Sequence, residues 1–244
     1  MTKTVIIAIS IVSAFIVAFG YAWPTMTNFA LENLNNDRVD AHKNLKVVSP
    51  DAFYNVSEAV ANVAHSALPD YLSKLLPERI MDYGFQSKDD LEKAYLLPPI
   101  PAFMPNRANA SLNQKFIEQY IDGASTIWFV PVAVGNSIAC LIEINLDEYN
   151  KPRAVSFGSS YKAKRIESGL NLLGWPNFNR WQDLRILSFY GPTVDFLLSK
   201  ESNGQWKWLN LTGTSNVKPI TLDSVGISKV LITINNTKST DTLP

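Results

Sequence analysis

The hydrophobic pattern changes its period about halfway along the chain. Up to residue 121, apolar side chains recur every three or four positions, which is the spacing of one face of a helix. From residue 126 they alternate every second position, as in a half-buried strand. The order predicts an α+β fold, in which N-terminal helices precede a mainly antiparallel, curved sheet with one helix packed across it.

The first predicted helix begins at Ser57, whose hydroxyl can cap it. Its apolar stripe consists of Val56, Val60, Val63, Ala64 and Ala67. Pro69 and Pro77 are expected to interrupt the helix, because proline lacks the backbone N–H that a helix interior uses. His65 lies one position off the stripe and is interpreted as a partly buried or solvated side chain without a catalytic partner.

Two shorter helices are predicted before the strands. The first has a capping-box-like start at Ser87 and Asp90, and the Pro98–Pro99 pair ends it. The second covers residues 111–121 and ends at Gly123. Its inward-facing side chains are expected to be Leu112, Phe116 and Ile117.

A hairpin is predicted where Gly135-Asn136 separates TIWFVPVAV from SIACLIEIN. Pro131 indicates that the first of these strands lies at a sheet edge or at a bulge. The second strand is expected to bury Ile138, Cys140, Ile142 and Ile144 on one face, which makes Cys140 a small buried hydrophobe.

The remaining elements follow in the order strand, helix and strands. PRAVSFG is a strand, and SYKAKRIESGLNLLG is a helix that closes at Gly174, with KAKR as its solvated face. The last strands are DLRILSFYG, TVDFLLSKE, QWKWLNL and KVLITIN at 229–235. Together these elements predict a single α+β domain over residues 57–237, followed by a frayed tail at 238–244.

The N-terminal segment is predicted to direct export. Lys3 precedes an apolar run, and small residues precede a cleavage position after Ala22, so residues 1–22 form either a signal peptide or a retained signal anchor. Residues 23–56 are predicted to be a polar helix or stalk. The rest of the chain is then periplasmic, extracellular or held at the outer face of the cytoplasmic membrane.

Composition excludes several classes of function. The 22 Lys and Arg residues equal the 22 Asp and Glu residues, so the chain lacks the basic excess typical of nucleic-acid binding. Cys140 is the only cysteine, which excludes an internal disulfide, and the two histidines lack zinc-site spacing. We therefore expect no metal, no cofactor and no nucleic-acid partner.

Two weak catalytic signals have simpler interpretations. Ser159 and Lys162 have the S-x-x-K spacing of penicillin-recognising enzymes, but the companion motifs are absent and Ser159 or Ser160 can simply cap a helix. Glu143 lies within an apolar strand, where burial would raise its pKa, but ordinary alternation places it on the solvated side of the sheet. No catalytic residue is assigned.

Aromatic residues give the best candidate for ligand binding. The loop GWPNFNRW at 174–181 holds three rings, and alternation places two tryptophans on one face of a nearby strand. The candidate ligand-binding residues are Trp175, Phe178, Trp181, Tyr190, Trp206 and Trp208. They line a groove for a protein, peptide or glycan, or they fill the core between sheet and helix.

YLSKLLPERIMDYGF, IWFVPVAVGNSIACLIEIN, RAVSFGSSYKAKRIESGL and ILSFYGPTVDFLL are similar to segments of uncharacterised exported bacterial α+β proteins. The resemblance covers roughly residues 70–211 and implies export and a similar sheet, without assigning any functional residue. The expected function is a non-catalytic interaction or ligand-binding module of the cell envelope. The alternative is a cell-wall or polysaccharide hydrolase with unidentified acidic residues.

Overall fold

The structure, a computed structural model, describes residues 50–105, 113–189, 194–211 and 220–236. The chain divides into two compact units, Met1–Leu45 and Lys46–Pro244, and every described residue belongs to the second. The predictions for residues 1–22, for most of the polar helix or stalk and for the tail at 238–244 lie outside these ranges. Within the described ranges, no helix has both the length and the apolar character needed to cross a membrane.

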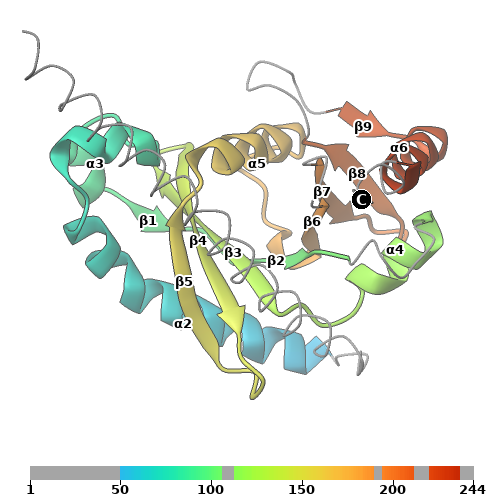
Figure 1. Cartoon of the computed structure of the whole chain (residues 1–244), viewed down its shortest axis with the longest axis horizontal. Helices are drawn as coiled ribbons and strands as arrows, with labels where there is room; N and C mark the ends of the chain where they lie inside the picture. Colours follow the sequence, from blue (N-terminus) through green and yellow to red (C-terminus); the bar gives the residue numbers. More distant parts are fainter. Residues whose placement is uncertain (1–49, 106–112, 190–193, 212–219, 237–244) are drawn as a thin grey trace, which may run out of the picture. The chain divides into compact units, whose positions relative to one another are not determined.

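The described unit is built on one nine-stranded sheet with the order β5-β4-β3-β2-β6-β7-β8-β9, in which β1 pairs with β3 (Figure 1). The pair β2 and β6 is parallel and every other pair is antiparallel, which confirms the predicted α+β class. The strands are β1 (Tyr95–Leu96), β2 (Ile100–Phe103), β3 (Ile127–Val134), β4 (Ser137–Leu146), β5 (Pro152–Gly158), β6 (Leu184–Phe189), β7 (Val194–Lys200), β8 (Trp206–Asn210) and β9 (Ile220–Leu222).

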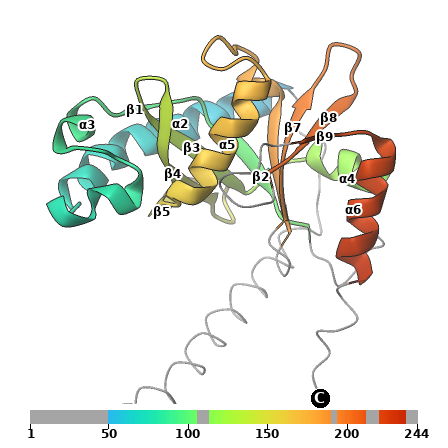
Figure 2. The same cartoon turned by 90° about the horizontal axis from the view of Figure 1, so that it is seen from above.

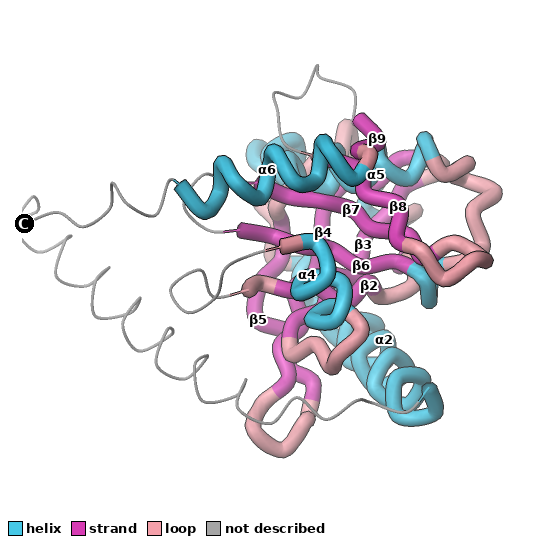
Figure 3. Tube along the Cα trace, turned by 90° about the vertical axis from the view of Figure 1, so that its right-hand side faces the viewer, coloured by secondary structure: helices cyan, strands magenta, loops and turns pink. Residues whose placement is uncertain are grey.

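Helices cover both faces of the sheet. Helix α5 (Ser160–Leu172) packs on one face, where its apolar residues join those of six strands in one core cluster. On the opposite face, α2 (Pro50–Ser73) packs over β3–β5, and α4 (Gln114–Ile121) and α6 (Ser224–Asn236) cover the other half of the sheet. Figure 2 shows α5 on one side of β7 and β8 and α6 on the other, and Figure 3 shows α4 beside α6.

In each half of the sheet a run of strands is followed by a helix, and the first half also has α4 between β2 and β3. Strands β2–β5 are followed by α5, and strands β6–β9 are followed by α6. The halves meet at the parallel pair of β2 and β6, and their closing helices lie on opposite faces. Helix α5 packs across the junction between the halves, because its core cluster contains residues of both β2 and β6.

The first helix is longer than predicted. It begins at Pro50, so that Ser57 lies inside it and does not cap it, and it continues through Pro69 to Ser73. Pro69 is tolerated because the carbonyl that it leaves without an intrahelical donor belongs to His65, which faces solvent. The predicted stripe is confirmed at Val60 and Ala64, which are fully buried. A 3-10 helix at Pro77–Tyr83 and the short helix α3 at Lys88–Glu92 follow.

The segment 229–235, predicted to be a strand, is helical and belongs to α6. Its buried side chains are Ile227, Leu231 and Ile234, spaced four and three positions apart as on a helix face. The amide of Gly226 donates to the Asp223 carboxylate at 2.7 Å, which caps the first turn. The β-branched residues that favoured a strand were therefore overridden by helical packing against the sheet.

The hairpin of β3 and β4 is confirmed, with Gly135 at φ 58° in its turn. Cys140, Ile142 and Ile144 share one face, but Ile138 belongs to the α5 face, because the pairing shifts register at Ala139. A side chain at Gly84 would approach the Ala139 carbonyl oxygen to 2.2 Å, so glycine is required beside this bulge.

Pro131 lies inside the sheet, between neighbours on both sides, and not at an edge. Its carbonyl accepts from Leu97, so its missing N–H faces the Pro98–Pro99 link between β1 and β2. The two short strands β1 and β2 were not predicted, because Pro98 and Pro99 separate them and Pro101 lies inside β2. In α4, Ile117 is buried as expected, whereas Phe116 is 37% exposed and Ile121 takes the second inward position. Leu112 lies outside the described residues.

Candidate functional site at the two ends of helix α5

Helix α5 packs its apolar centre against the sheet, and polar residues lie beside each of its ends. Ile166 and Leu170 are fully buried in the cluster beneath the middle of the helix. A Cβ at Gly169 would lie 2.9 Å from Leu211 Cδ2 and 3.0 Å from Leu197 Cδ2, so the helix and the sheet are in close contact there. The candidate chemistry therefore lies at the two ends of α5.

Strand β7 contributes to both ends. Asp195, Leu197 and Ser199 alternate along the strand on the face that α5 covers. Asp195 contacts the N-terminal half of α5, Leu197 lies under its centre, and Ser199 lines a pocket beside its C-terminal end.

The GWPNFNRW loop begins where α5 ends. Gly174 has φ 97°, and the amide of Trp175 donates back to the Leu170 carbonyl, which confirms glycine as the residue that closes the helix. The indole N–H of Trp175 donates to the Asn136 carbonyl at 3.1 Å, and that of Trp181 donates to the Phe178 carbonyl at 3.1 Å. These bonds tie the loop to the β3–β4 turn and to itself.

The three rings of this loop form one aromatic group. Trp175 and Trp181 meet edge to face with centroids 5.7 Å apart, and Phe178 and Trp181 do so at 6.0 Å. All three are half-buried and pack against the α5 core cluster. The rings hold the loop in place, because edge-to-face pairs add stabilisation to the buried apolar area.

An open pocket of about 320 Å³ lies between this loop and the sheet. Ser199 and Lys207, directly opposite each other on β7 and β8, belong to its lining. The other lining residues are Leu172, Leu173, Asn177, Phe178, Asn179, Arg180 and Glu201. The lining combines amides, one aromatic ring and charges of both signs, which suits a small polar ligand.

Arg180 is held by the protein, whereas the neighbouring amides are available. The Nε of Arg180 donates to Asp183 at 2.7 Å, and its Nη2 donates to the Lys200 carbonyl. Within the described part of the chain, the side-chain amides of Asn177 and Asn179 make no hydrogen bond to another protein group. Each of these amides offers both donors and an acceptor to a ligand.

Of the five predicted aromatic residues that the structure describes, three lie together. Trp206 and Trp208 point away from α5, into the core cluster beneath α4 and α6, where Trp208 packs against Phe196. They are therefore not beside the GWPNFNRW rings, because β8 alternation turns Lys207, and not the tryptophans, toward the pocket. Tyr190 lies outside the described residues.

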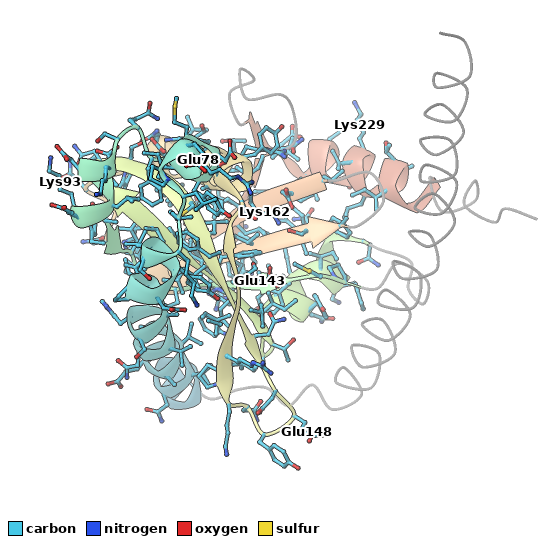
Figure 4. All side chains as sticks on the ribbon, turned by 60° about the vertical axis from the view of Figure 1, so that its left-hand side comes forward. Glu78, Lys93, Glu143, Glu148, Lys162 and Lys229 are labelled. Carbon is cyan, nitrogen blue, oxygen red and sulfur yellow. The ribbon has the colours of Figure 1, made fainter. Side chains whose placement is uncertain are left out.

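A buried polar cluster lies near the N-terminal end of α5. The Asp195 carboxylate accepts from Ser188 Oγ at 2.6 Å, and its Oδ1 lies 3.5 Å from Lys162 Nζ. Its Oδ2 lies 3.7 Å from Arg165 Nη1, and the Nε of Arg165 donates to the Leu211 carbonyl. Figure 4 shows Lys162 in the middle of the described unit, far from the tip of the β4–β5 hairpin, which Glu148 marks.

This cluster corrects the interpretation of KAKR as a solvated face. Lys162 and Arg165 point toward the sheet, and Lys164 points elsewhere, donating to Ser137 and Glu167. Lys162, Arg165 and Gly169 are three and four positions apart, and residues at this spacing share one face of a helix. The spacing therefore indicates that both cations lie on the face of α5 that packs on the sheet. Residue type alone predicts solvated side chains here, because lysine and arginine are seldom buried.

The cluster does not have the geometry expected of a serine nucleophile. Lys162 Nζ donates to Ser188 Oγ at 3.3 Å, but the Ser188 hydroxyl is already donated to Asp195 and is 5% exposed. The motif serines behave differently from the prediction: Ser159 makes no side-chain cap, and Ser160 Oγ donates to the Asp82 carbonyl at 2.8 Å.

The other sequence candidates lie apart from these two ends. Glu143 is half-buried and accepts a long bond of 3.4 Å from Ser156 Oγ. Cys140 is buried on the opposite face, where desolvation raises the pKa of its thiol to about 12. His65 is exposed. Among the described residues, no three His, Cys, Asp or Glu side chains are grouped closely enough to hold a metal ion.

Comparison of the chain with protein-family models, with curated proteins and with solved structures gave no significant match.

Proposed function

We propose that this chain is an exported, non-catalytic binding module of the cell envelope, and that it binds a short neutral glycan. The observation that carries the proposal is the pocket of about 320 Å³ beside the GWPNFNRW loop, with its amide-rich lining. A pocket of this volume accommodates one or two sugar units, in keeping with the lower range of small-molecule sites.

The lining residues support a hydroxylated ligand. Asn177 and Asn179 provide paired donors and acceptors, which match the dual character of a sugar hydroxyl. Phe178 offers apolar ring surface for the C–H face of a sugar ring. Glu201 and Lys207 carry opposite charges, and the third charged lining residue, Arg180, is paired with Asp183 at 2.7 Å, so these charges balance and favour a neutral ligand.

Export is proposed from the sequence alone. Lys3, the apolar run that follows it and the small residues before position 23 form a secretory pattern. Fractionation of the producing cells, with N-terminal sequencing of the exported chain, tests this part separately. Intact chain in the cytosol would contradict export without affecting the pocket.

A glycan array followed by calorimetry tests binding by the full chain. A hit should lose about tenfold in affinity in Asn177→Ala and in Asn179→Ala, because each substitution removes hydrogen bonds to the ligand. Asn171→Ala is the matched control, since Asn171 is an exposed asparagine on α5 that is not part of the pocket lining.

Three outcomes would contradict the glycan proposal. The first is that no glycan on the array binds. The second is that the control variant loses as much affinity as the two pocket variants. The third is that the chain binds a peptide on a parallel peptide array and not a glycan. Release of reducing ends from a bound glycan would instead favour the alternative of a polysaccharide hydrolase. That alternative requires a pair of carboxyl groups on either side of the scissile bond, whereas the pocket lining contains one, that of Glu201.

A further inference from the structure

Two cations occupy positions of α5 that face the sheet. The side chains of Lys162 and Arg165 are 24% and 9% exposed, and the Asp195 carboxylate between them is 4% exposed. Removing charges from water is costly unless each is paired and hydrogen-bonded. The buried charges of this group therefore need partners of opposite charge.

The pairing is incomplete on the cationic side. The charged groups that the described residues bring into contact here are two cations and one carboxylate, so their sum is +2 − 1 = +1. Among the described residues, the buried Nη2 of Arg165 has no hydrogen-bond partner. A buried guanidinium nitrogen without an acceptor is destabilising, and an oxyanion would supply that acceptor.

The end of the helix adds to the same field. Helix α5 has 13 residues, no acidic residue in its first turn and no side-chain cap at Ser159. The N-terminus of a helix carries a partial positive charge, and Lys162 adds a full one within the first turn. Both contributions favour an anion near Lys162, the more accessible of the two cations.

We infer that Lys162 and Arg165 form a binding site for a small oxyanion, such as inorganic phosphate or the carboxylate of a soluble metabolite. Lys162 Nζ and Arg165 Nη2 donate to it, and Asp195 holds both cations in place from the other side. Both cations lie within 3.7 Å of one carboxylate, so a second oxyanion can bridge them. Because the group is mostly buried, the ligand is a free small anion and not a lipid headgroup at a bilayer surface.

The test is calorimetric titration of the full chain with phosphate and with acetate, at constant ionic strength set with sodium chloride. The wild-type chain should bind at least one of the two anions. Lys162→Met should weaken binding by about tenfold or more, because it removes one charge-assisted bond and keeps the apolar stem. Lys162→Arg should restore most of the affinity.

Lys164→Met is the matched control, because Lys164 contacts Ser137 and Glu167 outside the cluster. It should bind the anion as the wild type does, and circular dichroism verifies that every variant is folded. Binding of phosphate alone or acetate alone supports the site and identifies the anionic group. No binding of either anion, or equal loss in the Lys162→Met and Lys164→Met variants, would overturn the proposal without bearing on the glycan pocket.

Discussion

The two ends of helix α5 differ in how they are assembled. The C-terminal end is a loop of residues adjacent in sequence, tied down by its own indole hydrogen bonds and by edge-to-face ring pairs. The N-terminal end joins α5, β6 and β7, and its contacts link residues up to 46 positions apart. The first end is open and lines a pocket, and the second buries charges.

This difference separates two kinds of site. An open end tolerates substitution, because water replaces whatever a side chain loses. An end with buried charges tolerates substitution poorly. When one charged side chain is removed, its partner remains charged and unpaired in a medium of low dielectric constant. Stability should therefore depend mainly on the N-terminal end of α5, whereas the proposed glycan binding should depend on the C-terminal end.

The largest expected contrast is between two carboxylates. Asp195→Ala removes the anion between Lys162 and Arg165, and we expect the free energy of unfolding to fall by about 3–5 kcal/mol. Glu201→Ala, in the pocket lining at the other end, should change it by no more than about 0.5 kcal/mol. Urea unfolding in a buffer without phosphate measures both, and equal effects would remove the distinction between the ends.

Substitutions of two glycines, Gly169 and Gly174, test the packed centre of α5 and its C-terminal end separately. Gly169→Ala should cost about 1–2 kcal/mol, because overpacking against Leu211 and Leu197 outweighs the better helix propensity of alanine. Gly174→Ala should cost about 1 kcal/mol for a different reason, since its φ of 97° disfavours a Cβ although no atom lies within 4 Å.

A double-mutant cycle with Leu211→Ala distinguishes these two causes. The truncation makes room for a methyl group at Gly169, so the two substitutions should couple by more than about 0.5 kcal/mol. The same cycle with Gly174 should show additivity. Additive effects at Gly169 would mean that α5 does not lie as close to the sheet as its contacts indicate.

Thiol labelling compares the ends with little disturbance of the fold. The native Cys140 should not react with the reagent, because burial raises the pKa of its thiol to about 12 and keeps the reactive thiolate scarce. Asn177→Cys should react as an exposed thiol. Ser188→Cys should react at least about a hundredfold more slowly, since labelling requires local opening of the cluster. Similar rates would show that the N-terminal end is open.

Local sequence signals predicted the elements whose determinants are contiguous. Gly135-Asn136 predicted the hairpin and Gly174 predicted the end of α5, because each supplies the positive φ that its turn requires. The aromatic loop was found in the same way. These features depend on neighbouring residues, so the sequence is sufficient to locate them.

Features that depend on tertiary contacts were missed or placed wrongly. Alternation in β8 predicted that Trp206 and Trp208 share a face, but it could not say that α4 and α6 cover that face. The β-branched run at 229–235 is helical because its apolar positions pack against the sheet at helical spacing. The sequence predicts solvated side chains at Lys162 and Arg165, because their partner, Asp195, lies 30 or more positions away.

The measurement that tests the central claim most directly is an NMR titration of the full chain with the best-binding glycan. We follow the indole N–H signals, which report on individual tryptophans. Those of Trp175 and Trp181, in the loop beside the pocket, should shift with the affinity found by calorimetry. The signal of Trp208, buried on the opposite face, should stay in place. Shifts of Trp208 without shifts of Trp175 and Trp181 would contradict binding at the C-terminal end of α5.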